Sequence, residues 1–270
     1  MKLRNIFSRR NRILLRELVI TDFKLKYQGS ALGYLWSILK PLMLFAILYV
    51  VFVKFLRWGG DIPHFAVYLL TGTVLWNFFT EATSLGLKSI VDRRDLLRKI
   101  NFPRYILTIS ATVSALITLL INLCVIFIFA LINGVDFTWN VLLLPIVLIE
   151  LYAFALGVAF LLGTIYVKYR DVAHIWDVVV QGMFYATPII YPLTMVMDVN
   201  PAIAQFLLVN PMAQMIQDAR YLVVTQDTIT IWNIGVPPLA QFIPIAIVFL
   251  FAAWAALYFH KRSKNFAEDI

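Results

Sequence analysis

Six long apolar runs constrain this chain more than any other feature of its sequence. A helix needs about 20 apolar residues to cross the roughly 30 Å hydrocarbon layer of a bilayer. These runs reach that length, and they lack the alternation of polar and apolar residues that is typical of barrel strands. Each run therefore predicts a helix that satisfies its own backbone hydrogen bonds. The runs occupy residues 38–56, 65–85, 105–132, 141–167, 178–196 and 238–259.

The composition agrees with an all-α integral membrane protein that has six transmembrane helices, since 61% of the residues are hydrophobic and 14% are charged. Lysine and arginine are frequent before the first run, after the second and fourth runs, and in the tail, but rare in the other loops. The positive-inside rule then predicts a multi-pass protein with an even number of spans and both termini in the cytoplasm. The net charge of +8 is divided among several loops, which disfavours nucleic-acid binding.

The predicted organisation has three parts: a cytoplasmic arm over residues 1–33, a six-helix membrane domain over 34–260, and a cytoplasmic tail over 261–270. The chain has a single cysteine, Cys124, and its histidines at 64, 174 and 260 lie in separate segments. The sequence therefore predicts no metal site. The acidic residues are scattered through the loops, so we also expect no catalytic group of the kind that acid–base chemistry needs.

The arm carries an amphipathic pattern over residues 12–28, in which Ile13, Ile20 and Phe23 share one stripe of a helix. Flanking arginine and lysine stems can reach lipid headgroups from such a helix. The pattern predicts a helix that lies in the plane of the membrane interface. It serves either as a simple anchor or as a gate that contacts a partner or an anionic lipid.

The loop over residues 88–104 contains six cations together with apolar Ile90, Leu97 and Ile100. Helical spacing would put the apolar side chains on a face opposite Arg94 and Arg98. A short helix of this kind suits docking on a soluble partner, although the same composition fits an ordinary solvated loop. Pro103 ends the segment before the third run.

The fifth run is interrupted by Pro188 and Pro192. The segment that follows, residues 198–236, is moderately apolar, and stretches 202–209 and 212–223 are each too short to cross a bilayer. Short helices beside a proline-broken span are typical of re-entrant elements. We therefore expect short re-entrant helices at the outer mouth.

Three ordered stretches give the chain a family resemblance over nearly its whole length. It resembles the permease subunit of ABC-2-type polysaccharide exporters, which move lipid-linked O-antigen, capsule or wall teichoic acid. The first stretch is Phe23-Lys-Leu-Lys-Tyr with Ser30-Ala-Leu-Gly-Tyr-Leu-Trp36 and Lys40-Pro41, and the second is Leu96-Leu-Arg-Lys-Ile-Asn-Phe-Pro-Arg104. The third is Tyr169-Arg-Asp-Val-Ala-His174 with Thr187-Pro-Ile-Ile-Tyr-Pro192, followed by Asn210-Pro211 and Arg220.

The resemblance implies a homodimer paired with two copies of a separate ABC ATPase, which holds the ATP and magnesium. This chain lacks the Gly-x-x-x-x-Gly-Lys-Ser/Thr phosphate loop, so we expect a transport subunit with no cofactor of its own rather than an enzyme. The resemblance also implies an ABC-2 exporter fold with a gate helix in the arm. It places a coupling helix over Lys88–Lys99 in the 88–104 coupling loop, with Arg93, Arg94, Leu97, Arg98 and Lys99 as the coupling residues.

The cargo implied by the resemblance is a glycopolymer on a polyprenyl pyrophosphate carrier. Cations that could bind the pyrophosphate, or only attract anionic headgroups at about 1 kcal/mol each, are Arg12, Arg16, Lys24 and Lys26. Aromatic side chains that could line a sugar tunnel, or only pack and form interface belts, are Phe45, Tyr49, Trp76, Phe79, Tyr185 and Tyr191.

Other functions remain open at this stage. One alternative is a permease of the same fold that exports a small molecule or drug. A membrane glycosyltransferase would need grouped acids, and a secondary transporter would carry intramembrane charge pairs. Glu81 and Glu150 lie within or near predicted spans, and neither has an evident cationic mate in the sequence. We expect both to be helix–helix hydrogen-bonding groups.

Overall fold

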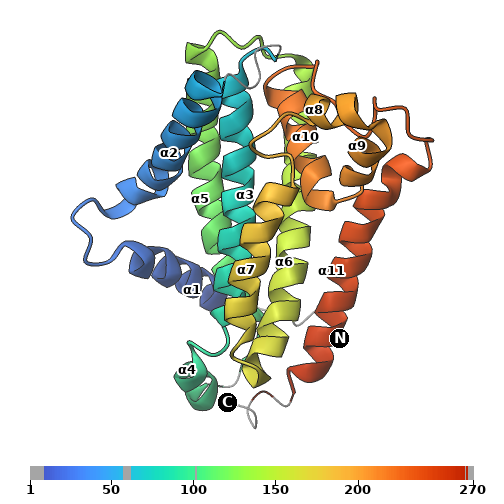
Figure 1. Ribbon diagram of the computed structural model, residues 1–270. Coiled ribbons are helices and arrows are strands. Elements are labelled where there is room, and N and C mark those ends of the chain that lie inside the picture. The colour runs from blue at the N-terminus through green and yellow to red at the C-terminus, as the bar shows by residue number, and fades with distance from the viewer. Residues whose placement is uncertain (1–8, 57–61, 101, 265, 267–270) are drawn as a thin grey trace.

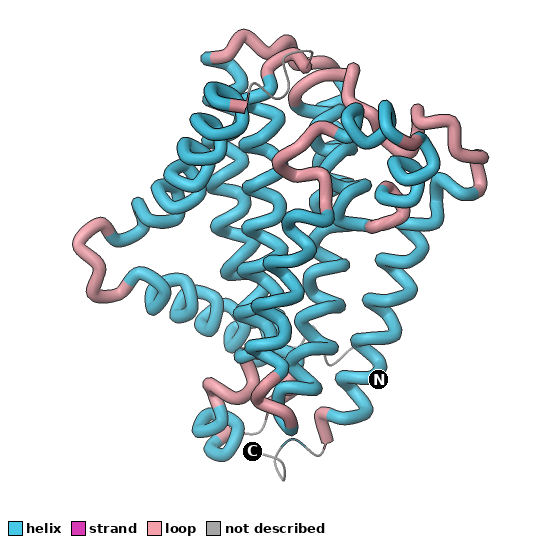
Figure 2. The backbone as a smooth tube through the Cα atoms, viewed as in Figure 1, coloured by secondary structure: helices cyan, strands magenta, loops and turns pink. Residues whose placement is uncertain are grey.

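The computed structural model describes residues 9–56, 62–100, 102–264 and 266, and all its regular elements in these ranges are helical. The body is a bundle of four long helices: α3 (Phe65–Lys88), α5 (Tyr105–Ile132), α6 (Leu144–Lys168) and α11 (Ile243–Arg262). Helix α3 packs on both α5 and α6, while α11 covers the far side of α6 (Figure 1). Most loops gather at the two ends of the bundle (Figure 2).

Four segments are long and apolar enough to cross a membrane: Gly33–Phe55, Tyr105–Ile132, Trp139–Lys168 and Ala240–Arg262. They correspond to the predicted first, third, fourth and sixth runs. The first consists of a short 3₁₀ turn (Gly33–Leu35), α2 (Trp36–Leu48) and a π-helical stretch (Tyr49–Phe55). The chain is therefore a multi-pass helical membrane protein by composition and length.

Helix α3, which corresponds to the second run, is the central helix. It is not among the four apolar segments, and it carries Asn77, Thr80 and Glu81 in its C-terminal half. Its 24 residues extend about 36 Å at 1.5 Å per residue, which is enough to cross a bilayer. Most of its side chains are buried against neighbouring helices, so its polar groups face protein rather than lipid.

The fifth predicted span, residues 178–196, is wrong in its bounds. Helix α7 begins earlier and has 15 residues (Val172–Ala186), and α8 (Leu193–Val199) is separate. At 1.5 Å per residue α7 is about 22 Å long, shorter than the hydrocarbon layer. The break follows from Pro188 and Pro192, since proline lacks the amide hydrogen that continues a helix.

Arg220 satisfies the backbone that this break exposes. Its guanidinium is fully buried and donates hydrogen bonds to the carbonyl oxygens of Pro188 at 2.7 Å and Ile189 at 2.6 Å. It also lies 3.6 Å from the ring centroid of Tyr68. On α3, a Cβ added to Gly72 would come within 2.3 Å of the guanidinium, so a glycine there leaves room for it.

Short helices α8, α9 (Pro201–Leu207) and α10 (Pro211–Val223) gather at one end of the bundle (Figure 1). The expected stretches 202–209 and 212–223 are thus helical, and α8 is an additional helix. In both Asn-Pro pairs the asparagine caps the helix: Asn200 accepts from the amide of Ala202 and Asn210 from that of Met212. Proline then occupies the first turn, where its missing donor is not needed.

Helix α1 (Arg9–Tyr27) lies across the opposite end of the bundle, near the short helix α4 (Arg94–Lys99) (Figure 1). The expected helix over 12–28 is confirmed, and α1 packs mainly on α5. The expected coupling helix is shorter than its loop, because α3 continues to Lys88. Helix α11 runs on to Arg262, and residues 1–8, 265 and 267–270 of the predicted arm and tail lie outside the described residues.

Because α3 packs closely on α6, we expect a single added methyl group at Gly86 to change the stability of the protein. A Cβ at Gly86 would lie 2.4 Å from the Cβ of Ala159 on α6, whereas a Cβ at Gly182 on α7 meets nothing within 4 Å. We expect Gly86→Ala to lower the free energy of unfolding by about 1–3 kcal/mol through overpacking. Gly182→Ala should instead stabilise α7 slightly, because alanine favours the helix. Thermal unfolding in detergent would contradict this packing if both variants shifted alike.

Candidate functional site

A cavity of about 610 Å³ lies between α1, α2, α3 and α5. It borders the C-terminal half of α3, the half that leads towards α4. Its walls combine apolar side chains with hydroxyl and amide groups, two lysines and one carboxylate. The lining residues are Lys26, Ser30, Trp36, Ser37, Lys40, Pro41, Leu44, Val74, Asn77, Phe78, Thr80, Glu81, Ser84, Leu85, Ala115, Thr118, Leu119 and Asn122.

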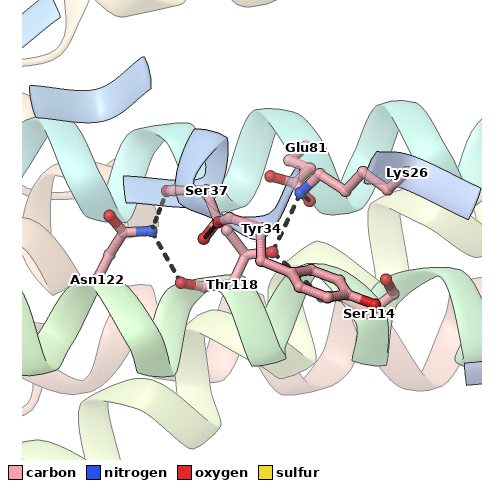
Figure 3. A network of polar contacts seen from close by, with 7 residues as sticks. All are labelled: Lys26, Tyr34, Ser37, Glu81, Ser114, Thr118 and Asn122. Atoms are coloured by element: carbon pink, nitrogen blue, oxygen red, sulfur yellow. Dashed lines mark hydrogen bonds and ion pairs between the residues drawn. The ribbon is translucent and has the colours of Figure 1, made fainter. Parts of the chain in front are cut away.

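An ion pair crosses this cavity wall. The Lys26 Nζ of α1 lies 2.5 Å from the Glu81 Oε1 of α3 and donates at 3.1 Å to the Thr118 hydroxyl of α5 (Figure 3). Glu81 therefore joins two helices, as expected, and it does so through a cationic mate that was not evident in the sequence. Its mate precedes it by 55 residues and comes near only because α1 lies across the bundle end.

A second set of hydrogen bonds attaches α2 to α5 beside this ion pair (Figure 3). The Asn122 amide donates to the backbone oxygens of Ser37 at 3.1 Å and Thr118 at 2.8 Å. The Ser37 hydroxyl donates to the Tyr34 carbonyl at 2.7 Å. These bonds hold the start of α2 against the bundle, so the cavity has polar walls on both sides.

A further ion pair joins α1 to the loop before α4, between Asp22 and Arg93. Burial lowers the pKa of the Arg93 guanidinium, but arginine remains charged at neutral pH because its ordinary pKa is above 12. Of the predicted coupling residues, Arg93 therefore points into the permease. Leu97 is half-buried beside Leu14 and Leu18 of α1, and the exposed members are Arg94, Arg98 and Lys99.

The apolar face expected for this loop forms only in part. Ile90 is fully buried and Leu97 of α4 packs against the cluster that contains Ile90, but Ile100 is 41% exposed. The reason is that α4 ends at Lys99 and Ile100 is already extended. Leu14, Leu15 and Leu18 of α1, which the predicted apolar stripe did not include, pack with Leu97 against Phe102 and the start of α5.

The predicted phosphate-binding cations do not lie together. Lys26 lines the cavity, while Arg12, Arg16 and Lys24 are exposed along α1. Lys40 of α2 lines the cavity too, and it was not among the predicted residues. The available signal was its position in the Lys40-Pro41 pair at the start of the first run.

The six candidate tunnel aromatics fall into two groups. Phe45, Trp76 and Phe79 are buried in the main core, where Phe79 stacks on a phenylalanine of α6. A tunnel role for these three would require the core to open. Tyr49 and Tyr191 are half-buried and Tyr185 is 60% exposed. The tunnel role stays a prediction, and the aromatic rings that line the cavity are Trp36 and Phe78.

Glu150 behaves as expected, since it links two helices through hydrogen bonds. Gln214 of α10 donates to Glu150 of α6 at 3.5 Å and to Asp218 at 2.5 Å, and the Trp232 indole donates to Asp218 at 3.2 Å. Burial raises the pKa of the Asp218 carboxyl to about 6. Within the described residues, no three histidine, cysteine or acidic side chains come together as a metal site would require.

A helical bundle with four membrane-length segments and a polar-walled cavity at one end has the organisation of a membrane transport protein. Residues 13–224 match the family described as ABC-2 type transporter. Because this match covers more than half of the 270 residues, the chain belongs to the ABC-2 type transporter family. The family resemblance seen in the sequence is thereby confirmed, and the chain is a transport subunit.

Several curated relatives are similar over most of this chain. The O-antigen export system permease protein RfbA of Myxococcus xanthus is 31% identical over 258 residues, which is 95% of each protein. Two proteins of the same name from Klebsiella pneumoniae are 31% and 28% identical over 205 residues, covering 74% of this chain and 76% of each relative.

The raised pKa of Asp218 predicts a pH dependence of stability. Between the ordinary carboxyl pKa near 4 and about 6, the folded protein holds a proton that the unfolded chain releases. This contribution is complete below about pH 4 and is lost as the pH rises through about 6. We expect Asp218→Asn to reduce the fall in thermal midpoint between pH 5 and pH 8.

The matched control is Asp198→Asn, which changes an exposed acid on neighbouring α8. It should keep the wild-type pH profile in the same detergent. An unchanged profile for Asp218→Asn would show that this carboxyl does not titrate in the folded protein over that range.

Proposed function

We propose that this protein is the permease subunit of an ATP-driven exporter that moves a polyprenyl-pyrophosphate-linked glycopolymer out of the cytoplasm. The observation that carries this proposal is the 31% identity to an O-antigen export permease over 95% of both chains. Because this alignment covers 95% of the chain, it includes segments of the arm, the residues that line the cavity and the short helices α8, α9 and α10. The names of the relatives favour a glycopolymer over a small molecule or drug.

We place the protein in the bacterial cytoplasmic membrane with six crossings and both termini in the cytoplasm. Five crossings are formed by the α2 segment, α3, α5, α6 and α11. The remaining crossing combines α7 with the broken segment that Arg220 holds. An even number of crossings agrees with the basic loops, which lie at the end that carries α1 and α4.

The cytoplasmic end offers α4 as the contact for the ATPase. Helix α4 projects from the bundle end (Figure 1), and Arg94, Arg98 and Lys99 are exposed on it. Leu97 anchors the same helix on the permease, so a push on α4 is transmitted to the bundle. We propose a homodimer with two ATPase subunits, which would bind the ATP and magnesium.

The cavity supplies groups that suit a sugar diphosphate. Lys26 and Lys40 provide two positive charges for phosphate oxygens. Trp36 offers a flat apolar face with a polar tip, and Asn77 offers an amide, both of which suit a sugar ring. Arg12, Arg16 and Lys24 would gather the anionic carrier along the exposed side of α1.

The proposed function is tested with the permease co-purified with its ATPase in lipid vesicles. We expect a lipid-linked glycopolymer to stimulate ATP hydrolysis several-fold, and amphiphilic drugs to leave the rate unchanged. A permease alone should hydrolyse no ATP, because the chain has no phosphate loop. Stimulation by drugs without any response to glycopolymers would replace this proposal with the small-molecule alternative.

The exposed face of α4 predicts a coupling effect. Arg94→Glu reverses an exposed charge without touching the packing of Leu97, so the complex should assemble while stimulated hydrolysis falls. Lys261→Glu is the control, since Lys261 is also an exposed cation but lies at the end of α11. Normal stimulated turnover of Arg94→Glu in vesicles would remove α4 as the contact.

A further inference from the structure

Four charged side chains form a continuous series from the loop before α4 to the cavity. Arg93 pairs with Asp22, and Lys26 pairs with Glu81. Asp22 and Lys26 are four residues apart on α1, so they lie on one face of the helix and one turn apart. The charges alternate in sign along the whole series. Helix α1 thus carries one pair towards the proposed ATPase contact and the other into the cavity wall.

These pairs are partly shielded from water. The side chains of Arg93 and Asp22 are 21% and 15% exposed, and those of Lys26 and Glu81 are 26% and 25% exposed. Asp22 Oδ2 and Arg93 Nη1 are buried with no hydrogen-bond partner. Because a bidentate pair would satisfy both atoms, a small shift of the loop against α1 changes how well this pair is satisfied.

The position of α1 does not depend on these charges alone. Leu14, Leu15 and Leu18 pack against the start of α5 and against α4. The two pairs can therefore separate without detaching α1, which is what a movable linkage requires.

We propose that Asp22 and Glu81 are positioning residues of the exporter, an inference that rests on the proposed function. Asp22 makes α1 follow α4 when the ATPase moves that helix. Glu81 holds Lys26 at the cavity wall until a phosphate-bearing group enters and takes its place. The cavity and the ATPase contact then act on the same helix, so occupation of one is communicated to the other.

The replacement of Glu81 follows from charge and hydrogen bonding. A diphosphate carries more negative charge and more acceptor oxygens than one carboxylate, and Lys26 can donate to it without leaving the cavity. Lys40 also lines the cavity and adds a second cation for the same group. Release of Glu81 removes an ion pair between α1 and α3.

The role proposed for Asp22 is tested by exchanging the charges of Asp22 and Arg93 in the permease–ATPase complex. Asp22→Arg and Arg93→Asp should each reduce glycopolymer-stimulated hydrolysis roughly tenfold, which is typical of coupled neighbours. The double variant restores an ion pair and should recover the rate to within about twofold. Glu17→Gln is the matched control, since Glu17 is an exposed acid on the same helix. A double variant no better than the singles would overturn the role of Asp22.

The role proposed for Glu81 is tested by measuring the glycopolymer concentration that gives half-maximal stimulation of ATP hydrolysis. Glu81→Gln removes the competing carboxylate, so this concentration should fall several-fold, whereas Lys26→Gln should raise it. A merely structural role of the pair would shift both variants in the same direction, and that result would overturn the role of Glu81. Vesicles with and without anionic phospholipid distinguish the two sources of phosphate. If the half-maximal concentration falls only in vesicles with anionic phospholipid, a lipid headgroup occupies the site. If it falls in both kinds of vesicle, the occupant is the glycopolymer carrier.

A distance measurement keeps the test independent of the cargo. Cys124 is the single cysteine and is exposed on α5, so spin labels on Cys124 and on Glu17→Cys report how α1 moves. Trapping nucleotide on the ATPase should change this distance in the otherwise unaltered permease and in the Asp22→Arg, Arg93→Asp double variant, but not in Asp22→Arg alone. Equal movement in all three would overturn the linkage. Failure of every glycopolymer to stimulate hydrolysis would instead contradict the proposed function.

Discussion

The need to satisfy every backbone hydrogen bond inside a bilayer governs this structure. Helices meet that need within a single segment, which is why the described chain is built from them. The requirement becomes specific where the helix fails, at the Thr187–Pro192 stretch. There the carbonyl oxygens released by two prolines are taken up by the guanidinium of Arg220, which is itself kept charged and buried by Tyr68 and by the space at Gly72. This contact joins α10 to the broken segment and to α3.

The end of the bundle that carries α4 depends on a different interaction, the docking of α1 across the bundle. Its leucines cover α4 and the start of α5, and its charged face meets α3 and the loop before α4. Helix α1 is thereby in contact with both the cavity wall and the loop before α4. The proposed gate role depends on these two contacts of one helix.

Much of the helical content could be predicted from the sequence because long apolar runs and Asn-Pro caps are local signals. The runs of α5, α6 and α11 and the two capped helices α9 and α10 appeared close to their predicted bounds. The bounds of the fifth span were wrong because hydropathy does not register that Pro188 and Pro192 interrupt the hydrogen bonds of a helix. The coupling helix was overextended at its start, since residues 89–93 form turns and α4 begins only at Arg94.

The sequence by itself determined a basic-ended helical membrane protein and the family to which it belongs, because hydropathy, charge and ordered motifs are properties of neighbouring residues. Only the tertiary structure decided that Glu81 has Lys26 as its mate, that Arg93 points inward to Asp22, and that Lys40 faces the cavity. These contacts join residues far apart along the chain. Their existence depends on the angle at which α1 crosses the bundle, and packing between helices sets that angle rather than any local pattern.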